Sequence, residues 1–206
     1  MFSMDSDWAI CRGVLEAIRA LCQSKESPVI VELGSGKGTE ALTNIGKVYS
    51  VEHDEAWILN FDGVDYIHSP LTEINPISGF NHLQWYDSQI MFNHLPSSYD
   101  LLLVDGPPGS VGRSGILNHL DSVPDDVIWI IDDTLRTEES HLSDTIAISK
   151  SMLQYRFWNF SILSRMPIEA NTIDQIRHIS YSVMQEKSDA KIQFFYPGFR
   201  GRKVIT

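Results

Sequence analysis

Three glycines at alternate positions follow an acid in the stretch Val29–Leu42, which reads VIVELGSGKGTEAL. Its first five residues form a short, largely apolar run, typical of a strand that is buried on both faces. Glycines directly after such a strand let the backbone approach a ligand closely, because they carry no side chain. The stretch therefore predicts a binding turn, whose ligand is a phosphate, a dinucleotide or a group without phosphate.

Spacing tests the first two of these ligands. A phosphate-binding P-loop needs a glycine five residues before a Gly-Lys-Ser/Thr triplet. Here Gly38 follows Gly36-Lys37, and Val31 stands five residues before Gly36. A dinucleotide turn needs G-x-G-x-x-G, but Thr39 occupies the third glycine position. The sequence does not match the P-loop motif and matches the dinucleotide motif only in part. The pattern that remains is E-x-G-x-G-x-G.

Acidic residues end or follow three other apolar runs. In a parallel sheet, ligands bind at the carboxyl ends of the strands, near the point where the strand order reverses. The agreement between acids, glycines and strand ends is the main indication of a site. The acids, with the runs that they follow, are Glu52 after 48–51, Asp105 after 99–104, and Asp132 with Asp133 after 127–131.

Short apolar runs alternate with helical periods along the chain, which predicts an α/β fold with a parallel sheet covered on both faces. Segment 73–98 is mixed and aromatic, and is interpreted as a helix or a long loop. The expected strands are 29–33, 48–51, 64–67, 99–104, 127–131, 157–163 and 179–184. The expected helices are 5–22, 39–45, 55–60 and 137–153.

The length of 206 residues suits a single domain. We expect an N-terminal helix within 1–24, a core over 29–184 and a basic, aromatic tail over 187–206. The net charge of −11 disfavours nucleic-acid and membrane partners, although the tail's FRGRK could form a local basic patch. No secretory leader and no membrane-spanning run is visible. These features predict a cytoplasmic protein with a small-molecule partner, and a homo-oligomer is compatible with them.

The motifs ELGSGKG and YSVEHDEAW resemble the first two motifs of class I S-adenosylmethionine-dependent methyltransferases. The resemblance implies a doubly wound, Rossmann-like, mostly parallel seven-stranded sheet whose last strand is antiparallel. It places Glu32 at the cationic end of the cofactor, Glu52 on both ribose hydroxyls, and His53 or Asp54 beside the adenine. The cofactor-binding residues that it implies are Glu32, Gly34, Ser35, Gly36, Gly38, Glu52, His53, Ser69 and Asp105.

Each of these roles has a structural alternative. The glycines could form a tight turn without a ligand, and Glu52 could be a solvated acid at a strand end. His53 and Ser69, the latter expected near the adenine amine, could be ordinary structural residues.

IIDDTLR resembles the end of the fifth strand in catechol-type, metal-dependent O-methyltransferases. That resemblance implies that Asp105, Asp132 and Asp133 bind Mg²⁺, because a hard cation relieves the repulsion among three carboxylates. The resemblance to class I methyltransferases also places Asp105 beside the transferring methyl, as a catalytic residue. Alternatively Asp133 caps the next helix, Asp132 bonds to backbone or cofactor, and Asp105 forms an Asx-type turn.

The chain departs from the catechol-type pattern after its first aspartate. GPPG stands where those enzymes have a lysine, so that VDGPPG…GR…DD…R is closer to poorly characterised bacterial methyltransferase-like proteins. Other cationic or imidazole side chains could approach the site, but spacing gives none of them a role. They are Arg113, His119, Arg136 and His82.

The sequence thus predicts an S-adenosylmethionine-dependent methyltransferase that acts on an oxygen of a small hydroxylated molecule, with or without a divalent metal. An alternative is a non-catalytic protein that binds a cofactor or a partner on the same scaffold, since a fold alone does not establish chemistry. A third interpretation is a nicotinamide oxidoreductase.

Overall fold

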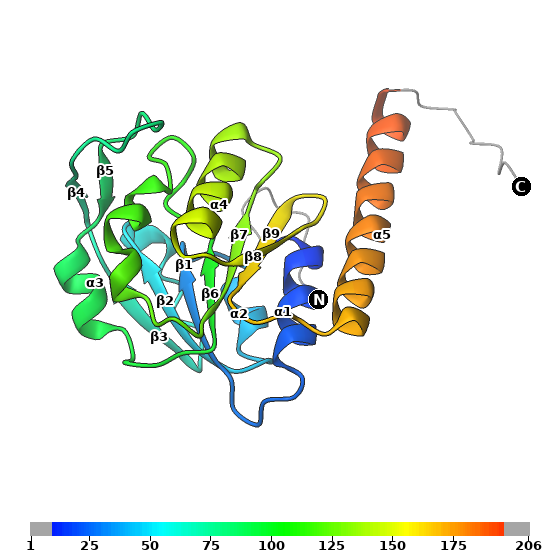
Figure 1. Ribbon diagram of the computed structural model, residues 1–206, viewed down its shortest axis with the longest axis horizontal. Coiled ribbons are helices and arrows are strands. Elements are labelled where there is room, and N and C mark those ends of the chain that lie inside the picture. Colours follow the sequence, from blue (N-terminus) through cyan, green and yellow to red (C-terminus); the bar gives the residue numbers. More distant parts are fainter. Residues whose placement is uncertain (1–9, 196–206) are drawn as a thin grey trace, which may run out of the picture.

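A computed structural model describes the backbone of residues 10–195. The predictions for residues 1–9 and 196–206, which include most of the basic tail, lie outside the described residues. Seven strands form one sheet at the centre of the molecule (Figure 1). In spatial order they are β3 (Val64–His68), β2 (Lys47–Glu52), β1 (Val29–Leu33), β6 (Leu101–Val104), β7 (Ile128–Asp132), β9 (Phe160–Ser164) and β8 (Leu153–Arg156).

The five strands from β3 to β7 run parallel, and β9 is antiparallel to both of its neighbours. Leu33 at the end of β1 lies opposite Val51 of β2 and Val104 of β6. The carboxyl ends of these strands therefore lie level along one edge. The predicted seven-stranded, mostly parallel sheet with an antiparallel last strand is confirmed.

Helices cover both faces of the sheet, as predicted. Ile30 packs in one core cluster with Ile18 of the first helix, whereas Val31 packs in the other with Met91 and Ile146. Consecutive residues of a strand point to opposite faces, so a continuous apolar strand builds both cores. The helices are α1 (Arg12–Cys22), α2 (Thr39–Leu42) and α5 (Ala170–Phe195) on one side, and α3 (Ser88–His94) and α4 (Thr137–Ser149) with the 3-10 segment Ser114–Ser122 on the other.

The prediction of a strand at 179–184 is wrong, because this segment lies inside α5. Its alternation of apolar and polar residues misled the interpretation. The buried positions of this helix follow three- and four-residue steps instead, and Tyr181 is 54% exposed. They include Ile173, Ile176, Ser180 and Val183. Figure 1 shows α5 alongside α1.

The sixth and seventh strands are β8 and β9, which replace the single strand predicted at 157–163. A tight turn separates them, in which the amide of Phe157 donates to the carbonyl of Phe160. The helix predicted to end at Leu153 ends at Ser149 instead. Leu153 is the first residue of β8. Two expected helices are also shorter, with α2 ending at Leu42 and a 3-10 turn at Glu55–Trp57.

Segment 73–98, which the sequence predicted as a helix or a long loop, contributes most of an antiparallel hairpin and a helix. The hairpin consists of β4 (Leu71–Glu73) and β5 (Gln84–Tyr86), and α3 follows it. Trp85 and Tyr86 are completely buried. Across residues 10–195, no helix has both the length and the apolar character that a membrane crossing requires.

Candidate functional site

The glycine turn and the loop after β6 meet where the strand order of the sheet reverses. From β1 the chain moves outward through β2 to β3, and later through β6 to β7 on the other side. In open α/β sheets, ligands bind at the carboxyl ends of the strands beside such a reversal. The predicted site residues Gly34, Glu52 and Asp105 all lie at this edge.

These two loops touch backbone to backbone. Gly34 has φ +96°, and a methyl group added to it would lie 2.7 Å from Cα of Gly106. A methyl group added to Gly106 would lie 2.5 Å from Cα of Gly34 and 2.6 Å from Oη of Tyr86. At Gly38 the same addition would lie 2.7 Å from the amide of Ile10. Gly34, Gly106 and Gly38 are therefore required by the packing of the chain itself.

Glu32 lies in β1, two residues before Gly34, and only one of its carboxylate oxygens accepts hydrogen bonds from the residues that the structure describes. Its side chain is buried, and Oε2 accepts hydrogen bonds from the hydroxyls of Thr39 at 2.8 Å and Ser50 at 2.6 Å. Oε1 is buried without a hydrogen-bond partner among the described residues. Burial raises the pKa of Glu32 to about 7, although both hydroxyls oppose the rise.

Glu52 is occupied mainly by the backbone. Oε1 accepts from the amides of His53 at 2.7 Å and Asp54 at 2.8 Å, and it lies 2.6 Å from Nδ1 of His53. Oε2 accepts one bond, from the amide of Ser35 at 2.9 Å. A carboxylate oxygen accepts about two hydrogen bonds. Only Oε2 therefore has capacity for a ribose hydroxyl, where the resemblance implied two contacts.

Ser69 and His53, which were expected near the adenine, differ in how freely their side chains could contact a ligand. Ser69 is buried, its hydroxyl donates to the carbonyl of Asp87 and its amide to that of Glu52. This geometry supports the structural alternative for Ser69. The His53 ring is 20% exposed and meets the edge of Tyr86 with centroids 6.2 Å apart.

Tyr86 is a site residue that the sequence did not indicate. Its hydroxyl is buried beside Gly106 without a hydrogen-bond partner among the described residues. Burial raises the pKa of Tyr86 well above its usual value, so the hydroxyl stays protonated. Tyr86 lies in the unassigned segment 73–98, where no periodic pattern distinguishes it.

Arg113 joins the acidic ends of β6 and β7. Its Nη2 donates to Oδ1 of Asp105 at 3.0 Å and to Oδ2 of Asp133 at 2.9 Å. Its Nη1 donates to the carbonyl of Asp132 at 3.0 Å, and its Nε to that of Pro107 at 3.4 Å. Only 3% of the side chain is exposed. The carboxylates of Asp105 and Asp133, and the backbone carbonyl of Asp132, therefore converge on a guanidinium, which spacing alone could not assign.

The carboxyl groups of Asp105 and Asp132 have raised pKa values. Burial raises the pKa of Asp105 to about 7. The positive charge of Arg113 opposes this rise, and the negative charges of Asp133 and Glu32 add to it. Burial, with the charges of Asp105 and Asp133, raises the pKa of Asp132 well above its usual value. Oδ1 of Asp132 accepts from the amide of Asp133 at 2.7 Å, as its backbone-bonding alternative proposed. No side chain caps α4, so Asp133 does not act as its cap.

No family model and no curated protein matches the sequence. Among solved structures, a methyltransferase-like protein from Silicibacter pomeroyi DSS-3 superimposes with a TM-score of 0.50 at 20% identity, over 86% of this chain and 98% of that chain. An rRNA methylase from Streptococcus thermophilus superimposes with a TM-score of 0.50 at 11% identity, over 80% and 100%. The chain has the class I methyltransferase fold. Identities this low show the fold alone.

The site of this methyltransferase fold does not fit a divalent metal as predicted. Arg113 already occupies the position between Asp105 and Asp133. Among the residues that the structure describes, no group of three or more His, Cys, Asp or Glu side chains is arranged to hold a metal ion. The predicted magnesium site therefore receives no support, and the catechol-type resemblance is unconfirmed.

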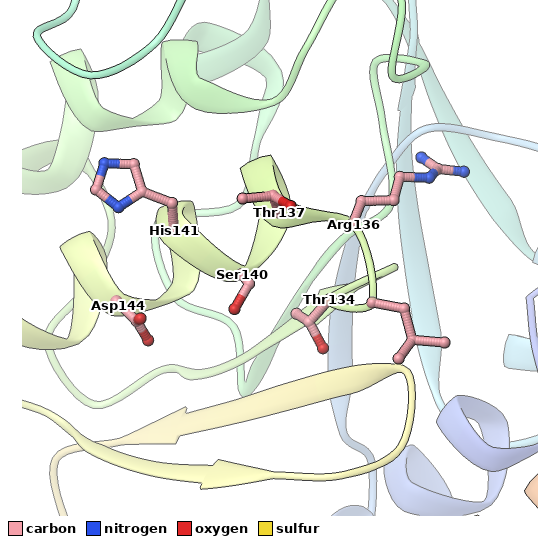
Figure 2. Close-up of a pocket in the computed structure, with 7 residues that line it drawn as sticks. Thr134, Arg136, Thr137, Ser140, His141 and Asp144 are labelled. Carbon is pink, nitrogen blue, oxygen red and sulfur yellow. The ribbon is translucent and has the colours of Figure 1, made fainter.

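A cavity of about 360 Å³ lies at the start of α4, and its first lining residue is Thr134 (Figure 2). In this view Ser140 and Asp144 point toward the β8–β9 hairpin, whereas Arg136 points away from it. A second cavity of about 330 Å³ lies at the end of α1. Neither is lined by Glu32, Gly34 or Glu52. The first is lined by Thr134, Leu135, Arg136, Thr137, Ser140, His141 and Asp144.

Proposed function

We propose that the protein is an S-adenosylmethionine-dependent methyltransferase that acts on an oxygen atom of a small hydroxylated molecule. The observation that carries the proposal is the free oxygen of Glu32, buried directly before the glycine turn at the reversal of strand order. A buried polar atom without a partner is costly, and a cationic ligand group would remove that cost. The amino group of S-adenosylmethionine is such a group.

The residues at this edge fit the cofactor in part. Glu32 would bind the amino group, Oε2 of Glu52 one ribose hydroxyl, and the Tyr86 hydroxyl is available as a donor. S-Adenosylmethionine, when bound, supplies a methyl group on a positively charged sulfur. Displacement at that carbon depends on alignment more than on acid–base strength. The close backbone contact between Gly34 and Gly106 supports such alignment.

Asp105 is the proposed proton acceptor. Arg113 holds its Oδ1, whereas Oδ2 has no hydrogen-bond partner in the described part of the chain, and 24% of the side chain is exposed. A pKa of about 7 suits a general base at neutral pH. Asp105 can therefore take the proton of a hydroxyl as the oxygen accepts the methyl group.

Two features support a small acceptor. The cavity of about 360 Å³ at the start of α4, which Thr134 lines directly after Asp133 in the chain, is lined mainly by polar side chains and suits a small molecule. The net charge of −11 opposes binding to a nucleic-acid backbone. RNA nevertheless belongs among the substrates tested, because the fold is shared with an rRNA methylase.

Replacing Asp105 tests the chemistry. We expect Asp105→Asn to lower kcat by roughly 100-fold while changing the affinity for S-adenosylmethionine less than about two-fold, because the amide oxygen can still accept from Arg113. The measurement is S-adenosylhomocysteine formation with a panel of hydroxylated small molecules, a protein and an RNA. Asp65→Asn is the control, since Asp65 is 51% exposed and pairs with Lys47. Unchanged kcat in Asp105→Asn would remove Asp105 from the mechanism.

The second candidate is a non-catalytic protein that binds the cofactor or a partner. The limited capacity of Glu52 for a ribose favours it, as does the absence of the glycine turn from both cavities. It predicts binding of S-adenosylmethionine without turnover on any substrate of the panel. Turnover with the RNA alone would instead replace the small acceptor by a nucleic acid.

A further inference from the structure

Arg113 is a permanently charged group in a place where most charges are costly. A guanidinium remains protonated at all relevant pH values and presents several donors in one plane. In this chain all three of its nitrogens donate to groups at the ends of β6 and β7. Removing one partner from a buried ion pair is strongly destabilising. Arg113 and the two aspartates therefore form one unit.

The loop around Arg113 fixes its position. Gly112 has φ +86° and lies directly against the His82 ring, and Gly115 lies directly against the Trp85 ring. A side chain at either glycine would overlap the ring. His82 is held in turn by Glu138 of α4, with Nδ1 and Oε1 2.8 Å apart. The GRSG segment thus packs against the β4–β5 hairpin, and α4 holds that hairpin through His82.

Arginine side chains, and not a metal, contact the carboxylates of Asp105 and Asp133. Asp105 and Asp133 share Nη2 of Arg113, and Oδ2 of Asp133 also lies 3.0 Å from Nη1 of Arg136. Two cations therefore contact these two carboxylates, and Arg136 also lies 3.5 Å from the carboxylate of Glu139. Oδ2 of Asp105 and Oδ1 of Asp133 keep no hydrogen-bond partner within residues 10–195, so the pair still offers two acceptors to a bound molecule.

We propose that Arg113 is a built-in counter-cation that stands where a divalent metal would otherwise bind, and that it positions Asp105 and Asp133 in its place. Any catalytic role of this positioning rests on the proposed methyl transfer. The arrangement itself is testable without any turnover. It implies that the wild-type protein neither binds nor needs a divalent cation at these carboxylates, and that removing the guanidinium converts them into a cation site.

The test is Mn²⁺ binding, followed by electron paramagnetic resonance and by thermal unfolding, in the full-length wild type and in Arg113→Ala. Wild type should bind no stoichiometric Mn²⁺ and should melt at the same temperature with and without EDTA. Arg113→Ala should melt lower without metal and bind about one Mn²⁺. At a concentration of about ten times the Kd, Mn²⁺ should raise its melting temperature by roughly 3–5 °C.

Three further variants separate this role from ordinary stabilisation. Arg113→Lys keeps the charge and should bind no Mn²⁺. Lys150→Met removes another buried cation, whose side chain is 7% exposed and pairs with Asp125, so it should lose stability without any response to Mn²⁺. Arg113→Gln keeps more side-chain volume and serves if Arg113→Ala does not fold.

Two results would overturn the proposal. One is stoichiometric Mn²⁺ binding by the wild type, with a melting temperature that EDTA lowers. The other is a folded Arg113→Ala or Arg113→Gln that ignores Mn²⁺. If neither variant folds with or without metal, the wild-type titration alone decides between the two cases. Loss of S-adenosylmethionine binding or turnover would bear on the proposed function and not on these readouts.

Discussion

Glu32 retains its proton in the folded protein to an unusually high pH. Burial raises its pKa from 4.5 to about 7, whereas in the unfolded chain it ionises near 4.5. Between these values the folded state binds more protons than the unfolded state. The contribution of Glu32 to the free energy of unfolding therefore falls as the pH rises through this interval. Above about pH 7 the folded protein bears the full cost of the buried charge.

Replacing Glu32 by glutamine should remove this cost. We expect Glu32→Gln to raise the free energy of unfolding by about 1–3 kcal/mol at pH 8 and to change it little at pH 5. Urea unfolding at both pH values measures the effect. Glu139→Gln is the control, because Glu139 is equally buried but lies 3.5 Å from Arg136, so its replacement should bring no gain at pH 8. Equal destabilisation by Glu32→Gln at both pH values would contradict this interpretation of Glu32.

At the scale of residues, the sequence indicated which acids lie at the site but not what they contact. Glu52 and the three aspartates end or follow apolar strands, and Glu32 lies one residue before the end of β1, which the sequence shows directly. Their partners come from elements whose position depends on tertiary packing. Arg113 reaches the site from a loop clamped by the β4–β5 hairpin, and Tyr86 from that hairpin itself. No local periodicity encodes either contact, so the magnesium prediction had no way to take the guanidinium into account.

At the scale of elements, the contact between the β1 and β6 loops makes a sharp prediction. Alanine at Gly34 would combine a positive φ, which costs about 1–2 kcal/mol, with a backbone clash against Gly106, which costs about 1–3 kcal/mol. Gly63 is a matched control, because its φ is +83° but an added methyl group would have an ordinary contact at 3.8 Å from Thr43. In urea unfolding, Gly34→Ala should lose at least about 1 kcal/mol more than Gly63→Ala. Equal losses would show that the two loops do not pack as described.

The elements themselves were predicted well where burial is two-sided. The central strands are continuous apolar runs between turn residues, and the structure has them within a residue or two. Errors concentrate in the last third, where β8 and α5 are exposed over part of their surface. There an alternating pattern over 179–184 competed with helical spacing, and packing of α5 against α1 decided the outcome. The short turn between β8 and β9 also carries no glycine or proline that would mark it.

At the scale of the whole molecule, the reversal of strand order gives the site two sides. Glu32 and Glu52 lie on the side of β1 and β2, where the cofactor is proposed to bind. Asp105, Arg113 and Asp133 lie on the side of β6 and β7, and Thr134, which follows Asp133, lines the cavity at the start of α4. The proposed transfer runs from the first side to the second, across the contact between Gly34 and Gly106.

Protonation of Glu32 should couple cofactor affinity to pH. An ammonium group bound at its free oxygen favours the ionised carboxylate, which is the minor form below about pH 7. Affinity for S-adenosylmethionine should therefore rise by up to about ten-fold between pH 6 and pH 8. Calorimetry across this range measures it. In Glu32→Gln the dependence should disappear, and a wild-type affinity that falls with rising pH would exclude this contact.

Calorimetric titration with S-adenosylmethionine at pH 8 tests the central claim most directly. The wild type should bind one equivalent, and Glu32→Gln, although more stable, should bind at least about ten-fold more weakly, as loss of a charge-assisted hydrogen bond requires. NAD should not bind. A wild type that binds NAD in place of S-adenosylmethionine, or neither, or a Glu32→Gln variant that binds S-adenosylmethionine as tightly as the wild type, would contradict the claim that this edge of the sheet is a methyl-donor site.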